Sequence, residues 1–291
     1  MSFLERYRKS LKPLEVEEWV DIVIYRPLGY LVAKPLSYTP ITPNMVTIIS
    51  VVVGLAGAYA IGLGSDDGII LGALLYAFAN VLDCTDGQLA RMTNRFSRYG
   101  RIFDGVADYI VGVAAFIAIG IGWRPQGYDL TEWWLLVLIG GMACTSYQSM
   151  HLNHIREAYL HLIGTDHVTE TRQQRRKNST TSTKRKFFLL PFYLLYLLYL
   201  RVERVVRRTV KVPIEVADPQ RRAKGLRFIL ILWTFTGKGT HVTMLTLFLL
   251  LKHPEDYCWF SLIPWNLWIL FTWIGHKRVI RSKTLKGAFR R

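Results

Sequence analysis

The sequence predicts an all-α integral membrane protein, built as a six-transmembrane-helix bundle with an amphipathic N-terminal juxtamembrane helix. Hydrophobic residues make up 51% of the 291 positions and the mean hydropathy is +0.20, which is high for a water-soluble chain. These residues also gather in long runs, and about 20 apolar residues in a helix cross the ~30 Å hydrocarbon layer of a bilayer. We therefore expect a membrane domain over residues 41–275, between an interfacial segment 1–40 and a basic tail 276–291.

The first element expected is a helix lying on the membrane within residues 1–40. Its apolar side chains recur at helical spacing, and acidic side chains occupy the opposite face. The apolar set is Val16, Trp19, Val20 and Val23, and the acidic set is Glu15, Glu17, Glu18 and Asp21. Two such faces are typical of an amphipathic helix at an interface.

The transmembrane spans follow in order along the chain. Each run approaches the length needed to cross the bilayer, and short polar turns separate several of them. The predicted spans are residues 45–63, 69 to about 81 with a continuation into an aspartate-rich stretch, 105–123, 133–150, 226–251 and 257–274.

Basic residues predict how these spans are oriented. The turns 64–68, 124–132 and 252–257 contain only Arg124 and Lys252, whereas the connections on the other side and both termini are rich in Lys and Arg. The positive-inside rule therefore places both termini and the 92–99 turn at the cytoplasmic face. The net charge of +16 follows from this asymmetry, so we expect anionic lipid and no nucleic acid as the partner of the basic segments.

One cytoplasmic segment, residues 160–225, is long and basic and contains a short apolar stretch at 187–200. Only about fourteen residues long and carrying Pro191, this stretch is short for a span, and a crossing there would invert the last two spans. We therefore expect an interfacial helix at 187–200. The pattern assigns no role to the rest of the insertion.

Four aspartates lie where a bilayer is expected. On a helix, Asp83 and Asp86 share a face with Gly87, Ala90 and Arg91, because these positions are spaced at i, i+3, i+4, i+7 and i+8. Gly100, Asp104 and Asp108 share a face of the next helix, at i, i+4 and i+8. The turn between the helices is short, so the two faces can meet.

Such an acid cluster is costly unless a cation compensates it. An acid near the centre of a membrane helix costs about 2.5–3.5 kcal/mol, and two carboxylates ~4 Å apart repel by about 4 kcal/mol at an effective dielectric of ~20. A cluster of carboxylate oxygens selects hard divalent ions such as Mg²⁺ or Mn²⁺. Beside it, Arg91 could pair with a phosphate, so the cluster predicts a phosphoryl-transfer site.

The two faces together have the spacing Asp83-x2-Asp86-Gly87-x2-Ala90-Arg91-x8-Gly100-x3-Asp104-x3-Asp108. This motif resembles the signature of the CDP-alcohol phosphotransferase (phosphatidyltransferase) family at all eight defining positions. The stretch "ITPNMVT" at 41–47 resembles the start of the first span in that family. The resemblance implies transfer of a substituted phosphate from a CDP-linked lipid donor to a small alcohol acceptor, with release of CMP, in phospholipid synthesis. It also implies a homodimer with its site open to the cytoplasm.

The resemblance further implies roles for individual residues. Asp83, Asp86 and Asp104 would ligate the metal, and Asp108 would complete that set and act as general base on the acceptor hydroxyl. The remaining motif positions would contact the CDP donor: Gly87, Ala90, Arg91, Ser97 and Gly100, with Asn44 and Thr47 as weaker candidates.

Several alternatives stay open at this stage. The acceptor can be inositol, inositol phosphate, glycerol phosphate, serine, choline or a lipid alcohol. Lys238 in "TGKGTH" is a candidate cation for a phosphorylated acceptor, although a simple helix break is the favoured interpretation of that stretch. His151, His154 and Glu157 share a helical face, for which the wet end of a span is favoured over a metal site. An ion or proton transporter is the alternative function for intramembrane acids.

Overall fold

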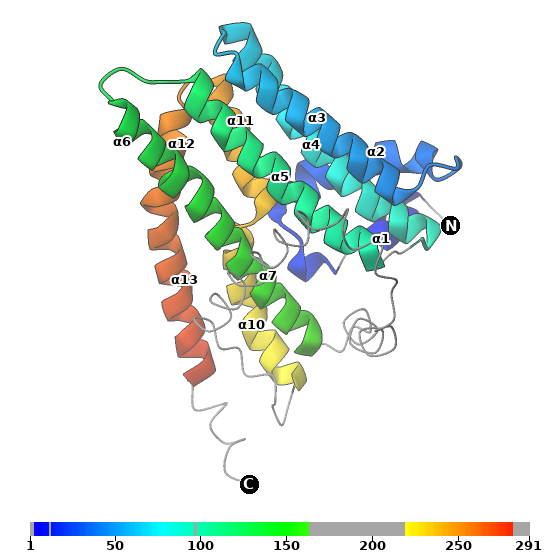
Figure 1. Ribbon diagram of the computed structural model, residues 1–291. Helices are drawn as coiled ribbons and strands as arrows, with labels where there is room; N and C mark the ends of the chain where they lie inside the picture. Colours follow the sequence, from blue (N-terminus) through cyan, green and yellow to red (C-terminus); the bar gives the residue numbers. More distant parts are fainter. Residues whose placement is uncertain (1–2, 12, 96–97, 163–218, 282–291) are drawn as a thin grey trace, which may run out of the picture. The chain divides into compact units, whose positions relative to one another are not determined.

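The computed structural model describes residues 3–11, 13–95, 98–162 and 219–281, and these residues are helical, with no strand among them (Figure 1). The predicted interfacial helix at 187–200 and most of the 160–225 insertion lie outside this part of the chain. The α-helices are α1 (Phe3–Ser10), α2 (Arg26–Leu36), α3 (Pro43–Gly62), α4 (Asp66–Thr93), α5 (Arg98–Gly122), α6 (Leu130–Leu135), α7 (Cys144–Leu162), α10 (Pro219–Thr234), α11 (Lys238–Leu250), α12 (Pro254–Leu262) and α13 (Pro264–Arg281).

The chain forms two compact units. The first contains residues 1–146 and 234–268, and the second contains residues 147–233 and 269–291. Within the second unit, the His151 ring stacks on Trp233 with ring centroids 5.8 Å apart, and Tyr147 contacts the same histidine edge-on. All of the predicted site residues that the structure describes lie in the first unit.

Four helical stretches among the described residues are long and apolar enough to cross a membrane: 43–62, 66–93, 103–122 and 254–276. They correspond to the first, second, third and sixth predicted spans. The six-span count is not confirmed. The predicted fourth span falls on α6, a π-helical segment (Leu136–Ala143) and the start of α7, which follow one another directly.

The predicted fifth span, 226–251, contains the helix break that the sequence favoured at "TGKGTH". It is divided into α10 and α11, because the chain leaves the helix at Phe235–Gly237 and starts a new one at Lys238. Gly237 precedes α11 in an extended conformation, with φ −84° and ψ 168°. The break places Lys238 at the first position of α11.

Local signals explain the ends of α3 and α4. The Thr42 side chain accepts a hydrogen bond from the Met45 amide and so caps α3, and Ser65 caps α4 in the same way through Gly68. α4 ends at Asn94, a residue in the left-handed conformation with φ 54°. With 28 residues, α4 is about 42 Å long at 1.5 Å per residue, so it exceeds the ~30 Å hydrocarbon layer.

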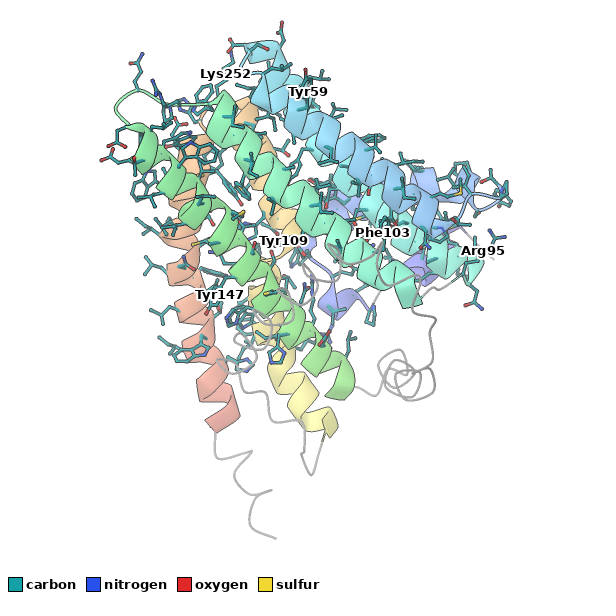
Figure 2. All side chains as sticks on the ribbon, viewed as in Figure 1. Tyr59, Arg95, Phe103, Tyr109, Tyr147 and Lys252 are labelled. Atoms are coloured by element: carbon teal, nitrogen blue, oxygen red, sulfur yellow. The ribbon has the colours of Figure 1, made fainter. Side chains whose placement is uncertain are left out.

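α4 is the central helix of the first unit and packs against α1, α2, α3 and α11. Figure 1 shows α3 and α5 side by side, and α3 packs against both α4 and α5. Two glycines permit the close approach of α3 and α4, because a Cβ on Gly57 would lie 3.0 Å from the Gly72 carbonyl oxygen and one on Gly72 would lie 2.6 Å from the Gly57 oxygen. Figure 2 places Arg95 at one end of this unit and Tyr59 with Lys252 at the other.

The predicted amphipathic helix near the N-terminus is not confirmed as one continuous helix. A 3₁₀ turn (Leu14–Val16) and a π-helical segment (Asp21–Tyr25) precede α2. The acidic residues Glu17, Glu18 and Asp21 are 4%, 2% and 8% exposed, whereas Trp19 and Val23 are exposed. These three carboxylates therefore point into the protein, where Arg26 binds Glu17 and Thr240 binds Glu18.

Candidate functional site

Three of the four aspartates meet where α4 and α5 face each other. One carboxylate oxygen from each of Asp83, Asp104 and Asp108 lies within 4.8 Å of the other two. Asp104 and Asp108 are one helical turn apart on α5, so they share a face as the spacing predicted. The spacing predicted that all four aspartates converge, and the structure brings these three together.

Asp86 lies one turn after Asp83 on α4 and is outside that group of three. It is 6% exposed, and the hydroxyl of Thr47, which is also buried, donates a hydrogen bond to its carboxylate. Thr47 comes from α3, so this candidate for a nucleotide contact also contacts an aspartate of the motif. A buried carboxylate is stabilised by such a donor, which fixes its orientation.

Lys238 contacts the same acid cluster from α11. Its ammonium nitrogen lies 2.9 Å from Asp83 Oδ2 and 2.5 Å from Asp108 Oδ1. The three side chains are partly exposed, at 37% for the lysine, 21% for Asp83 and 33% for Asp108. Sequence reasoning favoured a helix break at this stretch over a cation at the site. The helix break and the cation are both present, because α11 begins after the break with Lys238, and Lys238 contacts the acids.

The N-terminal segment holds the start of α11. The Glu18 carboxylate accepts hydrogen bonds from the Thr240 amide at 3.0 Å and from the Thr240 hydroxyl at 3.3 Å. A Cβ on Gly237 would collide with this carboxylate, and one on Gly239 would collide with Asp21. A carboxylate at a helix N-terminus is favourable, because it meets unpaired amides and the positive end of the helix dipole. Glu18 therefore caps α11 from more than two hundred residues away in the sequence.

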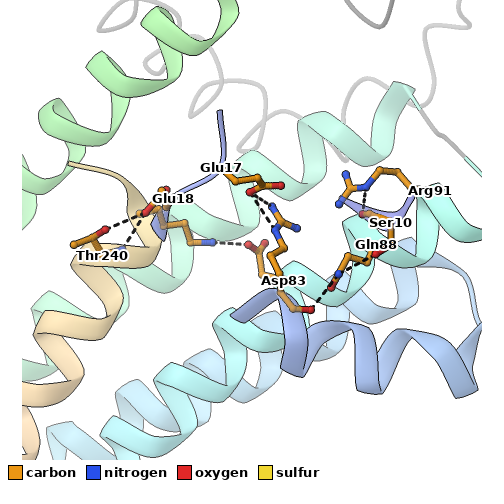
Figure 3. A network of polar contacts seen from close by, with 9 residues as sticks. Ser10, Glu17, Glu18, Asp83, Gln88, Arg91 and Thr240 are labelled. Carbon is orange, nitrogen blue, oxygen red and sulfur yellow. Dashed lines mark hydrogen bonds and ion pairs between the residues drawn. The ribbon is translucent and has the colours of Figure 1, made fainter. Parts of the chain in front are cut away.

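Arg91 lies on the far side of Asp83 from this contact (Figure 3). Its Nε donates to the backbone carbonyl of Ser10, and its guanidinium lies over Gly87, with Nη2 3.6 Å from the position of a Cβ there. Nη2 is buried and has no hydrogen-bond partner among the described residues. Nη2 of Arg91 therefore keeps its hydrogen-bond donors unused within the described residues.

A second set of contacts ties the N-terminal segment to α4. The Gln88 amide donates to Ser10 Oγ at 3.2 Å and to the Arg26 carbonyl at 3.1 Å, and Arg26 forms a buried ion pair with Glu17 at 3.1 Å. Burial by itself lowers the pKa of Arg26, but nearby negative groups, Glu17 among them, raise that pKa above its ordinary value. Sequence reasoning missed these residues. The acidic pattern 15–21 was their only signal, and it was interpreted as a solvent-facing side.

A small pocket adjoins the acid cluster. Its lining includes Ser50 from α3, Tyr76 and Asn80 from α4, and the Asp83, Asp108 and Lys238 side chains. Asn80 is 5% exposed, and its amide nitrogen has no hydrogen-bond partner within the part of the chain that the structure describes.

The other predicted residues are placed as follows. Gly87 and Ala90 are half-buried on α4, near Arg91. Asn44 is exposed at the start of α3, and Gly100 lies in the first turn of α5. Ser97 lies outside the described residues.

The donor set fits a divalent ion. It consists of carboxylate oxygens, which Mg²⁺ and Mn²⁺ prefer. Asp104 Oδ1 is buried with no hydrogen-bond partner among the described residues, so a ligand atom is left over at the cluster. His151, in contrast, packs between Tyr147 and Trp233.

Comparison with known families agrees with the geometry. The profile of the CDP-alcohol phosphatidyltransferase family matches residues 40–217, which is more than half of the chain and includes all four aspartates. The chain belongs to this family.

Several relatives match parts of the chain. An archaetidylinositol phosphate synthase from Pyrococcus horikoshii is 32% identical over 109 residues, 38% of this chain and 54% of the relative. A phosphatidylinositol phosphate synthase from Corynebacterium glutamicum is 33% identical over 110 residues, 38% of this chain and 47% of the relative. A "bifunctional IPC transferase and DIPP synthase" from Archaeoglobus fulgidus is 38% identical over 119 residues, 40% of this chain and 23% of the relative. The chain thus spans about half or less of the length of these relatives.

Proposed function

We propose that this chain transfers a substituted phosphate, a phosphatidyl group in the first instance, from a CDP-linked lipid donor to a small alcohol acceptor with release of CMP. The observation that carries the proposal is the convergence of Asp83, Asp104 and Asp108 from two helices within 4.8 Å. Family membership supports phosphotransfer as the reaction at this cluster. It does not support the alternative of a transporter. Apolar helices and a lipid-synthesis family together support a membrane protein of phospholipid biosynthesis.

Asp83, Asp104 and Asp108 would hold Mg²⁺ or Mn²⁺, with Asp86 as a further ligand oriented by Thr47. When bound, the divalent ion supplies charge neutralisation for the phosphate oxygens and for the departing CMP.

Asp108 is proposed as the general base. The acceptor hydroxyl gives its proton to the Asp108 carboxylate as its oxygen bonds to the lipid-side phosphorus of the donor. The bond between that phosphorus and the bridging pyrophosphate oxygen breaks, and CMP leaves with the electron pair. Asp108 borders the pocket beside the cluster, so a hydroxyl entering there can reach its carboxylate.

The CDP moiety is proposed to bind along the α4 face that contains Gly87, Ala90 and Arg91. The unpartnered Nη2 of Arg91 supports this assignment, because a phosphate oxygen is the acceptor that a guanidinium prefers. The absent side chain of Gly87 leaves room for that guanidinium. Gly100, Ser97, Asn44 and Thr47 remain proposed contacts of the CDP moiety.

For the acceptor we propose a phosphorylated polyol, with inositol phosphate first. Two relatives are named as synthases of inositol phosphate lipids, which supports this choice. Lys238 adds a cation at the acid cluster, where a phosphorylated acceptor needs positive charge.

We also propose that the protein crosses the membrane six times as a homodimer, with both termini and the site at the cytoplasmic face. The asymmetric distribution of Lys and Arg supports this orientation.

Purified protein in detergent, given CDP-diacylglycerol, Mg²⁺ and one alcohol at a time, tests the function through CMP release. The expected result is CMP release with inositol phosphate above that with inositol, glycerol phosphate, serine or choline. Release with none of these alcohols would refute the proposed acceptor class, and equal release without any acceptor would identify a hydrolase.

A further inference from the structure

A positively charged side chain contacts two members of the acid cluster. Lys238 forms ion pairs with Asp83 at 2.9 Å and with Asp108 at 2.5 Å, and both acids belong to the group whose oxygens lie within 4.8 Å. The ammonium group therefore neutralises part of the repulsion that these carboxylates exert on each other.

The ammonium and a divalent ion would bind the same two carboxylates, those of Asp83 and Asp108. Mg²⁺ binds carboxylate oxygens at about 2.0–2.1 Å, while the lysine nitrogen already contacts one oxygen of Asp83 and one of Asp108 at hydrogen-bond distance. Two cations that share these two carboxylates would repel each other. Each cation would therefore weaken the binding of the other at this cluster.

The lysine backbone is fixed, and its side chain can move. Glu18 binds the Thr240 amide two residues later, and Gly237 and Gly239 pack so closely on Glu18 and Asp21 that a Cβ at either glycine would collide. The Lys238 side chain is 37% exposed, and four rotatable bonds separate its ammonium from that fixed backbone. The ammonium group can therefore leave the carboxylates by side-chain rotation while the helix start stays in place.

We propose that Lys238 is the resting counter-cation of the acid cluster, and that binding of the divalent ion is a cation exchange that releases its ammonium from Asp83 and Asp108. The inference rests on the proposed function for the metal site and adds a step before catalysis. It assigns to Glu18 the role of a positioning residue, since Glu18 holds the start of the helix that carries the lysine.

Amine acetylation of the wild-type protein tests the exchange without any mutation. The acetylation rate of Lys238 is measured by peptide mass spectrometry with a chelator and with saturating Mg²⁺. Lys252 is the matched internal control, because it is also ion-paired. Its partner is Asp66, at the start of α4, whereas Asp83 lies in the second half of that helix. We expect Mg²⁺ to raise the Lys238 rate about tenfold and to leave the Lys252 rate unchanged. An unchanged or slower Lys238 rate overturns the exchange.

A variant gives the reciprocal measurement. Lys238→Met removes the competing charge, so its Mg²⁺ dissociation constant should be about tenfold lower than that of wild type, and its melting temperature in chelator should fall. Lys252→Met should change neither quantity. Weaker or equal Mg²⁺ binding by Lys238→Met would overturn the exchange, since lysine and metal would then not compete.

Neither measurement uses transfer activity. Transfer with no Mg²⁺ effect on Lys238 would therefore refute only the exchange, whereas a normal exchange without transfer to any acceptor would refute only the proposed function.

Discussion

Replacing Asp108 with asparagine separates its chemical role from its structural one. The side chain keeps its shape and loses its charge, so the ion pair with Lys238 is lost, while Asp83 still contacts the lysine at 2.9 Å. The pair is about one-third exposed at both ends, and pairs of this kind contribute ~0–1 kcal/mol to stability. Removing one carboxylate also relieves repulsion within the cluster. The free energy of unfolding should therefore change by less than about 1 kcal/mol.

The effect on transfer should be much larger. General-base assistance is worth about 10²- to 10⁴-fold in rate, which is about 2.7–5.4 kcal/mol of activation free energy at 1.36 kcal/mol per factor of ten. Asp108→Asn should thus fold, retain appreciable Mg²⁺ and CDP-donor binding through the other aspartates, and lose nearly all CMP release. The barrier to transfer should rise several times more than the stability falls.

Three measurements on the same preparation decide the matter: melting temperature, nucleotide binding and CMP release at saturating substrates. Asp66→Asn is the matched control, because it removes an ion pair with Lys252 away from the acid cluster, and it should behave as wild type. If Asp108→Asn keeps a transfer rate within a few-fold of wild type, the base assignment is wrong and the proton leaves to water or to another group.

Other predictions follow from the same geometry. Asp86→Asn should weaken Mg²⁺ and CDP-donor binding together, measured by calorimetry, and unchanged binding would remove Asp86 from the site. Chelation should lower both the melting temperature and CMP release, because a ligand of the folded state stabilises it by mass action; release that persists in chelator would exclude a metal requirement. Arg91→Lys should raise the KM for the CDP donor about tenfold or more, since a point charge replaces the paired donors of a guanidinium, and an unchanged KM would argue against the contact. Gly72→Leu should destabilise the protein by ~1–3 kcal/mol or more, because the new side chain would meet the Gly57 oxygen, and an unaltered melting temperature would contradict the close helix crossing.

The sequence was most informative where local periodicity decides the structure. The spacing of Asp104 and Asp108 on one helix and the apolar lengths of α3, α4 and α5 predicted both the helices and the meeting of the acids. The motif also predicted the family correctly. These features depend on residues near each other in the chain, so a pattern can reveal them.

The sequence was least informative where distant segments satisfy each other. Glu17, Glu18 and Asp21 formed an acidic face that predicted contact with water, yet Arg26 and the start of α11 receive two of these carboxylates inside the protein. The same limitation applies to Lys238, whose ion pairs join residues more than a hundred positions apart. No local pattern encodes the contacts of Lys238, because they form only when the start of α11 lies beside the aspartates of α4 and α5.

The most direct test of the central claim is the stoichiometry of transfer. Purified protein is incubated with CDP-diacylglycerol, Mg²⁺ and inositol phosphate, and both CMP and the new lipid are quantified by mass spectrometry over time. The account predicts one molecule of lipid product for each CMP released, with both abolished by a chelator and by Asp83→Asn. CMP released without a matching lipid product, or a product formed at the wild-type rate by Asp83→Asn, would contradict it.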